Sequence, residues 1–124
     1  MNENSVGFAG DDVSVSSGNV AAAAATVSLA AVAGKTNFVT GFDVTGAGAT
    51  AASVIQVTVS GLKAGTLTWL LAVPAGATVE AQPLQVRFPY PLVASGQDVA
   101  ITLTVPSFGA GNTNASAVLY GFQR

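Results

Sequence analysis

The chain has 124 residues, enough for one domain, and only 8% of them are Asp, Glu, Lys or Arg, against about 25% in an ordinary soluble domain. It contains no Cys and no His, which excludes disulfides, thiolate chemistry and Ser-His catalysis and makes zinc and copper sites improbable. Four scattered cations in an acidic chain argue against the basic stripe that nucleic-acid binding requires.

So few charges leave two interpretations of the surface. Ser, Thr, Asn, Gln and Gly can solvate it, or much of it is buried against copies of the chain or against another protein. We favour the second interpretation. No positively charged region precedes an apolar stretch near the N-terminus, and residues 21–33 are too polar for a membrane span, so we expect neither a secretory signal nor membrane insertion.

Residues 1–24 differ in kind from the rest of the chain. They are rich in Ser, Gly, Asn and Ala, carry three of the six acidic residues and show little periodicity. They are either a frayed terminus or an arm that becomes ordered on a neighbouring subunit. We therefore predict a flexible N-terminal arm over 1–24, with a weak strand inside it, and a β-sandwich domain over 25–124.

From about residue 25, apolar and polar residues alternate with the period of a β-strand. The clearest case is 66–73, where Leu67, Trp69, Leu71 and Val73 share one face, which places Trp69 in the core. The same reasoning groups Phe38 with Phe42 and Val44, and Val118 with Tyr120 and Phe122. About eight strands are predicted, over 13–16, 26–32, 37–45, 52–60, 66–73, 84–88, 98–105 and 115–122.

Gly and Pro mark the breaks between these strands. Residues 61–65 (GLKAG) predict a hairpin loop between two good strands. Residues 89–91 (PYP) predict an edge or a crossover between sheets, because both prolines lack an N–H. Short strands with crossovers are typical of two packed antiparallel sheets, so we predict an all-β sandwich of jelly-roll or Greek-key type. The strand order is not readable from the sequence.

The carboxylates offer little chemistry. Asp11 and Asp12 are the one adjacent acidic pair, and no run matches a calcium loop. A glycosidase needs two carboxylates across a cleft, and only Asp43, Glu80 and Asp98 lie in the strand region. Asp43 and Asp98 are predicted to face solvent or a partner, and Glu80 to lie in a loop. We predict no catalytic residue, no cofactor and no metal site.

Two aromatic residues fall outside the expected strands. Tyr90 stands between two prolines, and Phe108 begins a Gly-rich loop. They either plug the ends of the sandwich or anchor a contact with a neighbouring subunit, where Tyr and Phe are enriched. Our candidate interface residues are these two, Phe8 in the arm, and Asn112 and Asn114 in the loop that follows Phe108.

Four segments carry a resemblance to a known class of proteins: 38–50 (FVTGFDVTGAGAT), 88–96 (FPYPLVASG), 105–114 (VPSFGAGNTN) and 120–123 (YGFQ). Together they resemble small virion proteins of tailed bacteriophages, over roughly residues 25–124. The shared motifs are Gly and Pro turn signatures without chemistry. The resemblance implies a capsid decoration (cement) protein, made in the host cytoplasm, that binds the major capsid protein on the outer surface of the virion, commonly as a homotrimer.

A second hypothesis is a fibre or spike module that binds a cell-surface glycan. Exposed aromatic residues beside Asn or Asp are typical of sugar sites, and Tyr90 or Phe108 with Asn112 and Asn114 would supply them. A small enzyme is the weakest alternative, since the chain offers no general base of the usual kind and no metal ligand set.

Overall fold

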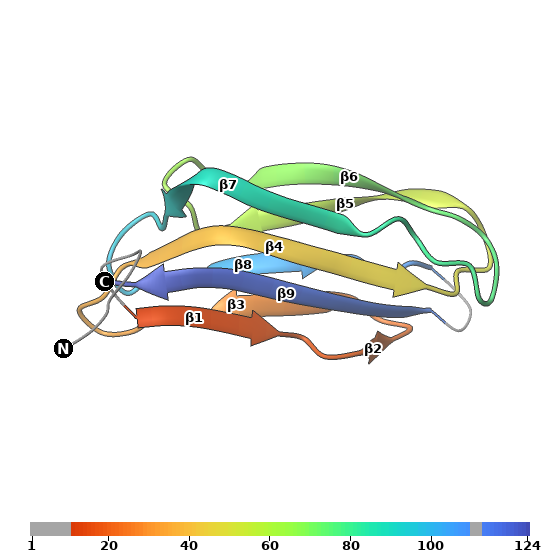
Figure 1. The fold of residues 1–124 in the computed structure, drawn as a ribbon, viewed down its shortest axis with the longest axis horizontal. Coiled ribbons are helices and arrows are strands. Elements are labelled where there is room, and N and C mark those ends of the chain that lie inside the picture. The colour runs from red at the N-terminus through yellow and green to blue at the C-terminus, as the bar shows by residue number, and fades with distance from the viewer. Residues whose placement is uncertain (1–10, 110–112) are drawn as a thin grey trace.

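The computed structural model describes residues 11–109 and 113–124 as two antiparallel β-sheets packed face to face (Figure 1). The strands are β1 (Asp11–Ser16), β2 (Val20–Ala21), β3 (Ala25–Leu29), β4 (Asn37–Ala47), β5 (Ser53–Ser60), β6 (Leu67–Val73), β7 (Leu84–Val93), β8 (Ile101–Val105) and β9 (Asn114–Gln123). The predicted all-β sandwich is confirmed, with a ninth short strand, β2, that the sequence did not indicate.

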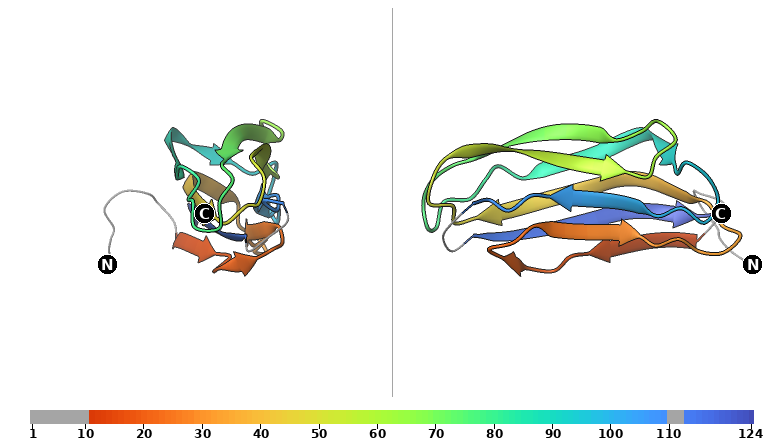
Figure 2. Two further views of the ribbon diagram at one scale, coloured as in Figure 1. Left: turned by 90° about the vertical axis from the view of Figure 1, so that its right-hand side faces the viewer. Right: turned by 180° about the vertical axis from the view of Figure 1, so that it is seen from behind.

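The strand order is that of a jelly roll. One sheet has five strands in the order β1-β9-β4-β7, with β2 also on β9, and the other has the order β3-β8-β5-β6 (Figure 2). The pairs β5–β6, β4–β7, β3–β8 and β1–β9 are all antiparallel. They are nested one outside the next in sequence, so the chain is one long hairpin rolled into two sheets. Its tip is the predicted hairpin loop at 61–65.

Two strands, β8 and β7, begin or end at other residues than the sequence predicted. β8 begins only at Ile101, because Asp98 has a positive φ of 61° and lies in a turn. β7 continues through Pro89 and Pro91 to Val93. Two prolines are tolerated there because β7 is an edge of its sheet, as the sequence predicted for this segment.

A β-bulge in β4 overturns one predicted face. The pairing register shifts between Val39 and Gly41, and an inserted residue exchanges inward and outward positions. Val39 therefore joins Phe42 in the core, both fully buried, while Phe38 stacks on Phe122 with ring centres 4.8 Å apart, outside the main core cluster. The expectation that Phe38 shares the face of Phe42 was wrong.

Val118, Tyr120 and Phe122 share one face of β9, as the sequence predicted, but this face points away from the main core. Ala115, Ala117 and Leu119 are buried in the core, whereas Val118 and Tyr120 are only partly buried. Tyr120 points outward, where its hydroxyl has a hydrogen-bond partner on β4.

Aromatic rings close the core on the side where β6 and β7 lie. Trp69 meets Phe42 edge-on, with ring centres 4.9 Å apart, and its centre is 6.1 Å from that of Phe88. Trp69 is half-buried and packs against the core. The sequence-based placement of Trp69 in the core is confirmed.

Part of the predicted N-terminal arm belongs to the sandwich. Residues 11–16 and 20–21 pair with β9 along its outer edge. Val13, Val15 and Val20 pack against the core, and their burial stabilises this pairing. Residues 1–10 of the predicted arm lie outside the described residues.

A buried amide joins the two sheets at one end of the sandwich. Asn37, at the start of β4, is 2% exposed. Its Nδ2 donates to the carbonyl oxygens of Leu29, Ala30 and Val99, at 3.1, 3.0 and 2.9 Å. Its Oδ1 accepts from Nε2 of Gln123, at 2.9 Å. One side chain thus links β4 and β9 to the segments that end β3 and precede β8.

We expect Asn37→Ala to lower the free energy of unfolding by about 2–4 kcal/mol, because it leaves buried carbonyl groups without donors. Urea unfolding followed by the fluorescence of Trp69, the single tryptophan, measures this. The matched control is Asn19→Ala, which removes an exposed amide bonded to Asn114 Oδ1 and should change stability by less than about 0.5 kcal/mol. Equal losses in the two variants would contradict the role assigned to Asn37.

Candidate functional site

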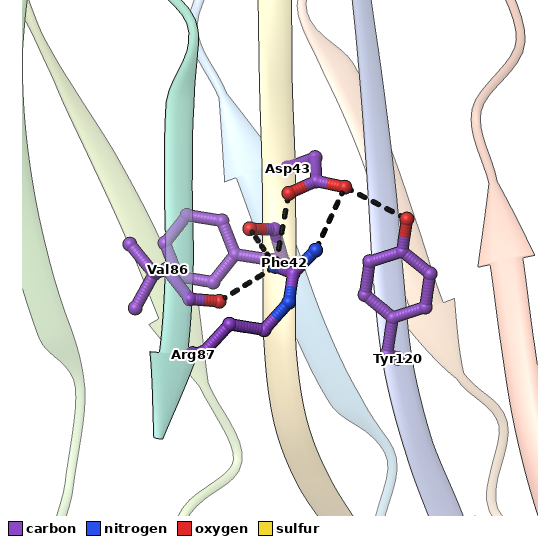
Figure 3. A network of polar contacts seen from close by, with 5 residues as sticks. All are labelled: Phe42, Asp43, Val86, Arg87 and Tyr120. Carbon is purple, nitrogen blue, oxygen red and sulfur yellow. Dashed lines mark hydrogen bonds and ion pairs between the residues drawn. The ribbon is translucent and has the colours of Figure 1, made fainter. Parts of the chain in front are cut away.

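Three polar side chains from neighbouring strands meet on the outer face of the five-stranded sheet (Figure 3). Arg87 on β7 donates from Nη1 and Nη2 to the two carboxylate oxygens of Asp43 on β4, at 2.9 and 3.3 Å. The Tyr120 hydroxyl on β9 donates to Asp43 Oδ2 at 2.7 Å. The guanidinium carbon of Arg87 lies 4.9 Å from the centre of the Tyr120 ring, within cation–π distance. We call these residues the Asp43 cluster.

A glycine lets the arginine reach across β4. Gly41 is the register partner of Arg87, and a Cβ at Gly41 would lie 2.9 Å from Arg87 Cδ and collide with the carbonyl oxygen of Val86. In the space left open, Arg87 Nη1 also donates to the carbonyl oxygens of Phe42 and Val86, at 3.2 and 2.9 Å. The bulge and the glycine therefore position the guanidinium over the sheet.

The cluster keeps its carboxylate ionised. The hydrogen bond from Arg87 is the main cause that holds the pKa of Asp43 below its ordinary value of 3.8, and Tyr120 and the Arg87 charge act in the same direction against partial burial. The hydrogen bond between Tyr120 and Asp43 also raises the pKa of Tyr120, chiefly because the Asp43 carboxylate holds the hydroxyl proton. An ionised carboxylate that already accepts these bonds ties three strands together and is poorly suited to proton transfer.

A polar cleft lies where β4 ends and β9 begins. Its volume is about 240 Å³. It is lined by Asn19, Thr45, Gly46, Ala47, Glu80, Asn114, Ala115 and Ser116. Asn19 Nδ2 donates to Asn114 Oδ1 at 3.0 Å. The cleft thus presents amide, hydroxyl and carboxylate groups side by side.

The four-stranded sheet has the opposite character. Its strands β3, β5, β6 and β8 contain no Asp, Glu, Lys or Arg. Val54 on β5 and Leu70 on β6 are 64% and 69% exposed, and exposed Ala72 is the register partner of Val54. We call these three residues the apolar corner. Beside it is a hollow of about 610 Å³ lined by Ala52, Ser53, Val54, Ala72, Val73, Pro74 and Gln82.

The predicted interface residues separate in the structure. Tyr90 is 79% exposed on β7, and its role in an interface stays a prediction. Phe108 is 2% exposed and packs against Gly46, where a Cβ would collide with the ring. It therefore takes the alternative role of plugging the end of the sandwich. Phe8 and Asn112 lie outside the described residues.

Asn114 lies far from Tyr90. It is the register partner of Ala47 at the end of β4, whereas Leu92, close to Tyr90 in sequence, pairs with Val39 near the start of β4. The structure therefore does not bring Tyr90 and Asn114 into one sugar site.

The remaining acidic residues are dispersed. Asp98 Oδ1 accepts from the backbone N–H of Gly34 at 2.8 Å, and Glu80 lies in a loop with a backbone bridge to Ala47. Within residues 11–109 and 113–124, no three His, Cys, Asp or Glu side chains are grouped so that they could hold a metal ion.

Comparisons with protein-family models, with curated proteins and with solved structures find no match to this chain. The described part of the chain has no helix long and apolar enough to cross a membrane.

Sequence reasoning missed Arg87 and Tyr120 as partners of Asp43. The outward direction of Asp43 was predicted correctly, and alternation with Val86 and Phe88 also directs Arg87 outward. Their meeting depends on the neighbouring order β7-β4-β9, which no local pattern contains.

We expect Asp43→Asn to lower the free energy of unfolding at neutral pH by about 1 kcal/mol, a modest effect because Arg87 is half exposed. The folded-state pKa of Asp43 is lowered from 3.8, so its contribution is full above that pH and is lost as pH falls through the folded-state pKa. Urea unfolding from neutral pH to about pH 2 should show the two proteins converging in stability.

The control for this experiment is Asp11→Asn. Asp11 is exposed and pairs with Lys35 Nζ at 2.7 Å, so its removal should have no measurable effect. A stability difference between wild type and Asp43→Asn that stays constant in acid would contradict the role assigned to the Asp43 cluster.

Proposed function

We propose that the chain is a structural virion protein of a tailed bacteriophage, a capsid decoration (cement) protein that binds the outside of the major capsid shell and stabilises it. The resemblance over roughly residues 25–124 supports this proposal, and the two-sheet sandwich is compatible with it. The proposal needs no catalytic group, in keeping with a sequence that lacks His and Cys.

The observation that carries the proposal is the uncharged four-stranded sheet with its apolar corner. Val54 and Leu70 are largely exposed in the single chain, and full burial of such a side chain is worth about 1.5–3 kcal/mol. Because the chain has few charged side chains, little electrostatic repulsion opposes association. This face therefore favours contact with another protein surface, in the first place with sister copies.

The proposed mechanism is additive burial. Each copy contributes a modest contact area, and simultaneous binding of many linked copies holds the shell together. We assign Tyr90 to a contact between sister copies, because β7 lies at the same long edge of the sandwich as β6 (Figure 2), and because exposed tyrosines are enriched in interfaces. We assign the N-terminal residues to the shell.

The direct test uses particles of the phage that encodes the chain. The purified protein should sediment with shells stripped of it, in many copies per particle, and should raise the temperature at which filled particles release their DNA. A fibre or spike module would be present in far fewer copies. Failure to bind such shells would overturn the proposal.

The shell contact is tested by a deletion that ends before β1, because β1 and β2 pair with β9. We expect removal of residues 2–10 to abolish shell binding while leaving the urea midpoint unchanged within error. Deletion of 2–24 would also remove core-packed Val13, Val15 and Val20 and serves as the destabilised control. Unchanged shell binding after deletion of 2–10 would contradict the role assigned to the N-terminal residues.

The polar cleft favours a second candidate function, recognition of a cell-surface glycan. Its amide, hydroxyl and carboxylate groups are the groups that orient a sugar. If this candidate holds, a glycan array should give a defined ligand, and Glu80→Ala should weaken its binding at least about tenfold. Glu80 is exposed, so this change should leave the fold intact. An array without a ligand would remove the candidate.

A further inference from the structure

We propose that two copies of the chain associate by antiparallel pairing of β6 with β6 across a two-fold axis, so that the two four-stranded sheets become one sheet of eight strands. This pairing makes a dimer, in place of the trimer that the resemblance implies. It depends on the edges of the sandwich and does not require that the protein bind a capsid.

Unpaired sheet edges invite another strand, and folded proteins usually protect them with charges, prolines, bulges or short strands. Three of the described edges are protected. β1 carries Asp11 and Asp12, β7 carries Arg87 and two prolines, and β3 has only five residues.

The fourth edge, β6, has none of these protections. It runs for seven residues, Leu-Thr-Trp-Leu-Leu-Ala-Val, without a charge or a proline. Its pairing with β5 is regular over all seven residues, so no bulge twists it away. It ends its sheet and pairs with β5 alone among the described strands.

The register of a two-fold pairing follows from the faces of the strand. Directly opposite residues in an antiparallel pair lie on the same face of the sheet, so an axis normal to the sheet must pass through a residue that faces itself. If Leu70 is the residue that faces itself, all seven residues of β6 are paired. Any other choice leaves part of the strand unpaired. With Leu70 facing itself, Thr68 lies opposite Ala72 on the outer face, and Trp69 lies opposite Leu71 on the inner face.

This register places the largest exposed apolar group of β6 where it is best buried. Leu70, 69% exposed in the single chain, packs against its own copy, with Cβ atoms about 4.5–5.5 Å apart. Ala72 and Val54 lie beside it on the outer face, so the apolar corners of the two copies join. The half-buried ring of Trp69 is also covered by Leu71 of the second copy.

The strand fits a second copy better than an unrelated partner strand. When β6 is paired with itself no like charges face each other, and in the Leu70 register the inner-face pairs Leu67–Val73 and Trp69–Leu71 and the outer-face pair Leu70–Leu70 are all apolar. The resulting contact is isologous, so it closes at two copies and leaves no further β6 edge exposed. If β6 instead paired with a strand of another protein, the purified chain would stay monomeric. The native mass of the purified chain therefore distinguishes the two partners.

The first test is native mass by size-exclusion chromatography with light scattering. We expect twice the chain mass of 12.2 kDa. Leu70→Lys places two like charges opposite each other at the two-fold axis and should raise the dimer dissociation constant at least about a hundredfold. The matched control, Thr26→Lys, adds the same charge at an exposed site on β3 of the same sheet and should remain dimeric. A wild-type monomer or trimer, or a dimeric Leu70→Lys variant, would overturn the pairing.

The second test reads the register directly and does not depend on the stability of a charged variant. The chain has no Cys, so Leu70→Cys introduces a single thiol opposite its copy, and mild oxidation should give a covalent dimer on a non-reducing gel. In Val54→Cys the two thiols lie on strands three spacings apart and are also offset along the strand direction, so they are separated by more than about 14 Å, which is too far for a disulfide. Cross-linking of both variants equally, or of neither, would overturn the Leu70 register.

These results are separable from the test of capsid binding. Leu70→Lys monomers that still bind shells would leave the decoration function intact and show that pairing is not required for it. A dimer that binds no shell would support the β6 pairing and overturn the proposed function.

Discussion

The buried amide of Asn37 is the contact on which the arrangement of the two sheets depends. A sandwich core of apolar side chains attracts without direction, so it does not by itself fix how one sheet ends relative to the other. Asn37 supplies that direction, because its Nδ2 reaches carbonyl groups of the four-stranded sheet while its Oδ1 and backbone belong with the five-stranded sheet. The Leu29 and Val99 carbonyl groups would lose these donors without Asn37, and an unsatisfied buried carbonyl is costly, so the end of β3 and the approach to β8 are held in place.

The bulge in β4 determines what both faces of the five-stranded sheet present. Before it, Phe38 stacks on Phe122 outside the main core. After it, Phe42 enters the core and meets Trp69, and Asp43 is turned outward between β7 and β9. The Asp43 cluster is thus a consequence of one inserted residue and of the missing side chain at Gly41. The same shift explains why a strict two-residue period misplaced Phe38.

The two sheets differ in surface character, although the chain as a whole has few charges. The five-stranded sheet carries Asp43, Arg87 and the polar cleft, whereas the four-stranded sheet has a neutral outer face and an unprotected edge at β6. A surface built in this way favours association at one sheet and solvation at the other. That division suits the proposed side-by-side assembly of copies, and the polar cleft where β4 and β9 meet suits the proposed glycan site.

The sequence by itself determined the class of the fold, the eight longer strands and the absence of His and Cys chemistry, and it narrowed the place of Pro89 and Pro91 to an edge or a crossover. These properties are local, since they follow from residue type and from a period of two. Only the tertiary structure decided the jelly-roll order, the inward face of β9, the burial of Phe108 and the meeting of Asp43, Arg87 and Tyr120. Each of these depends on which strands become neighbours. Residues 44 and 77 positions apart in the chain meet only after the whole hairpin has rolled, and no local pattern encodes that contact.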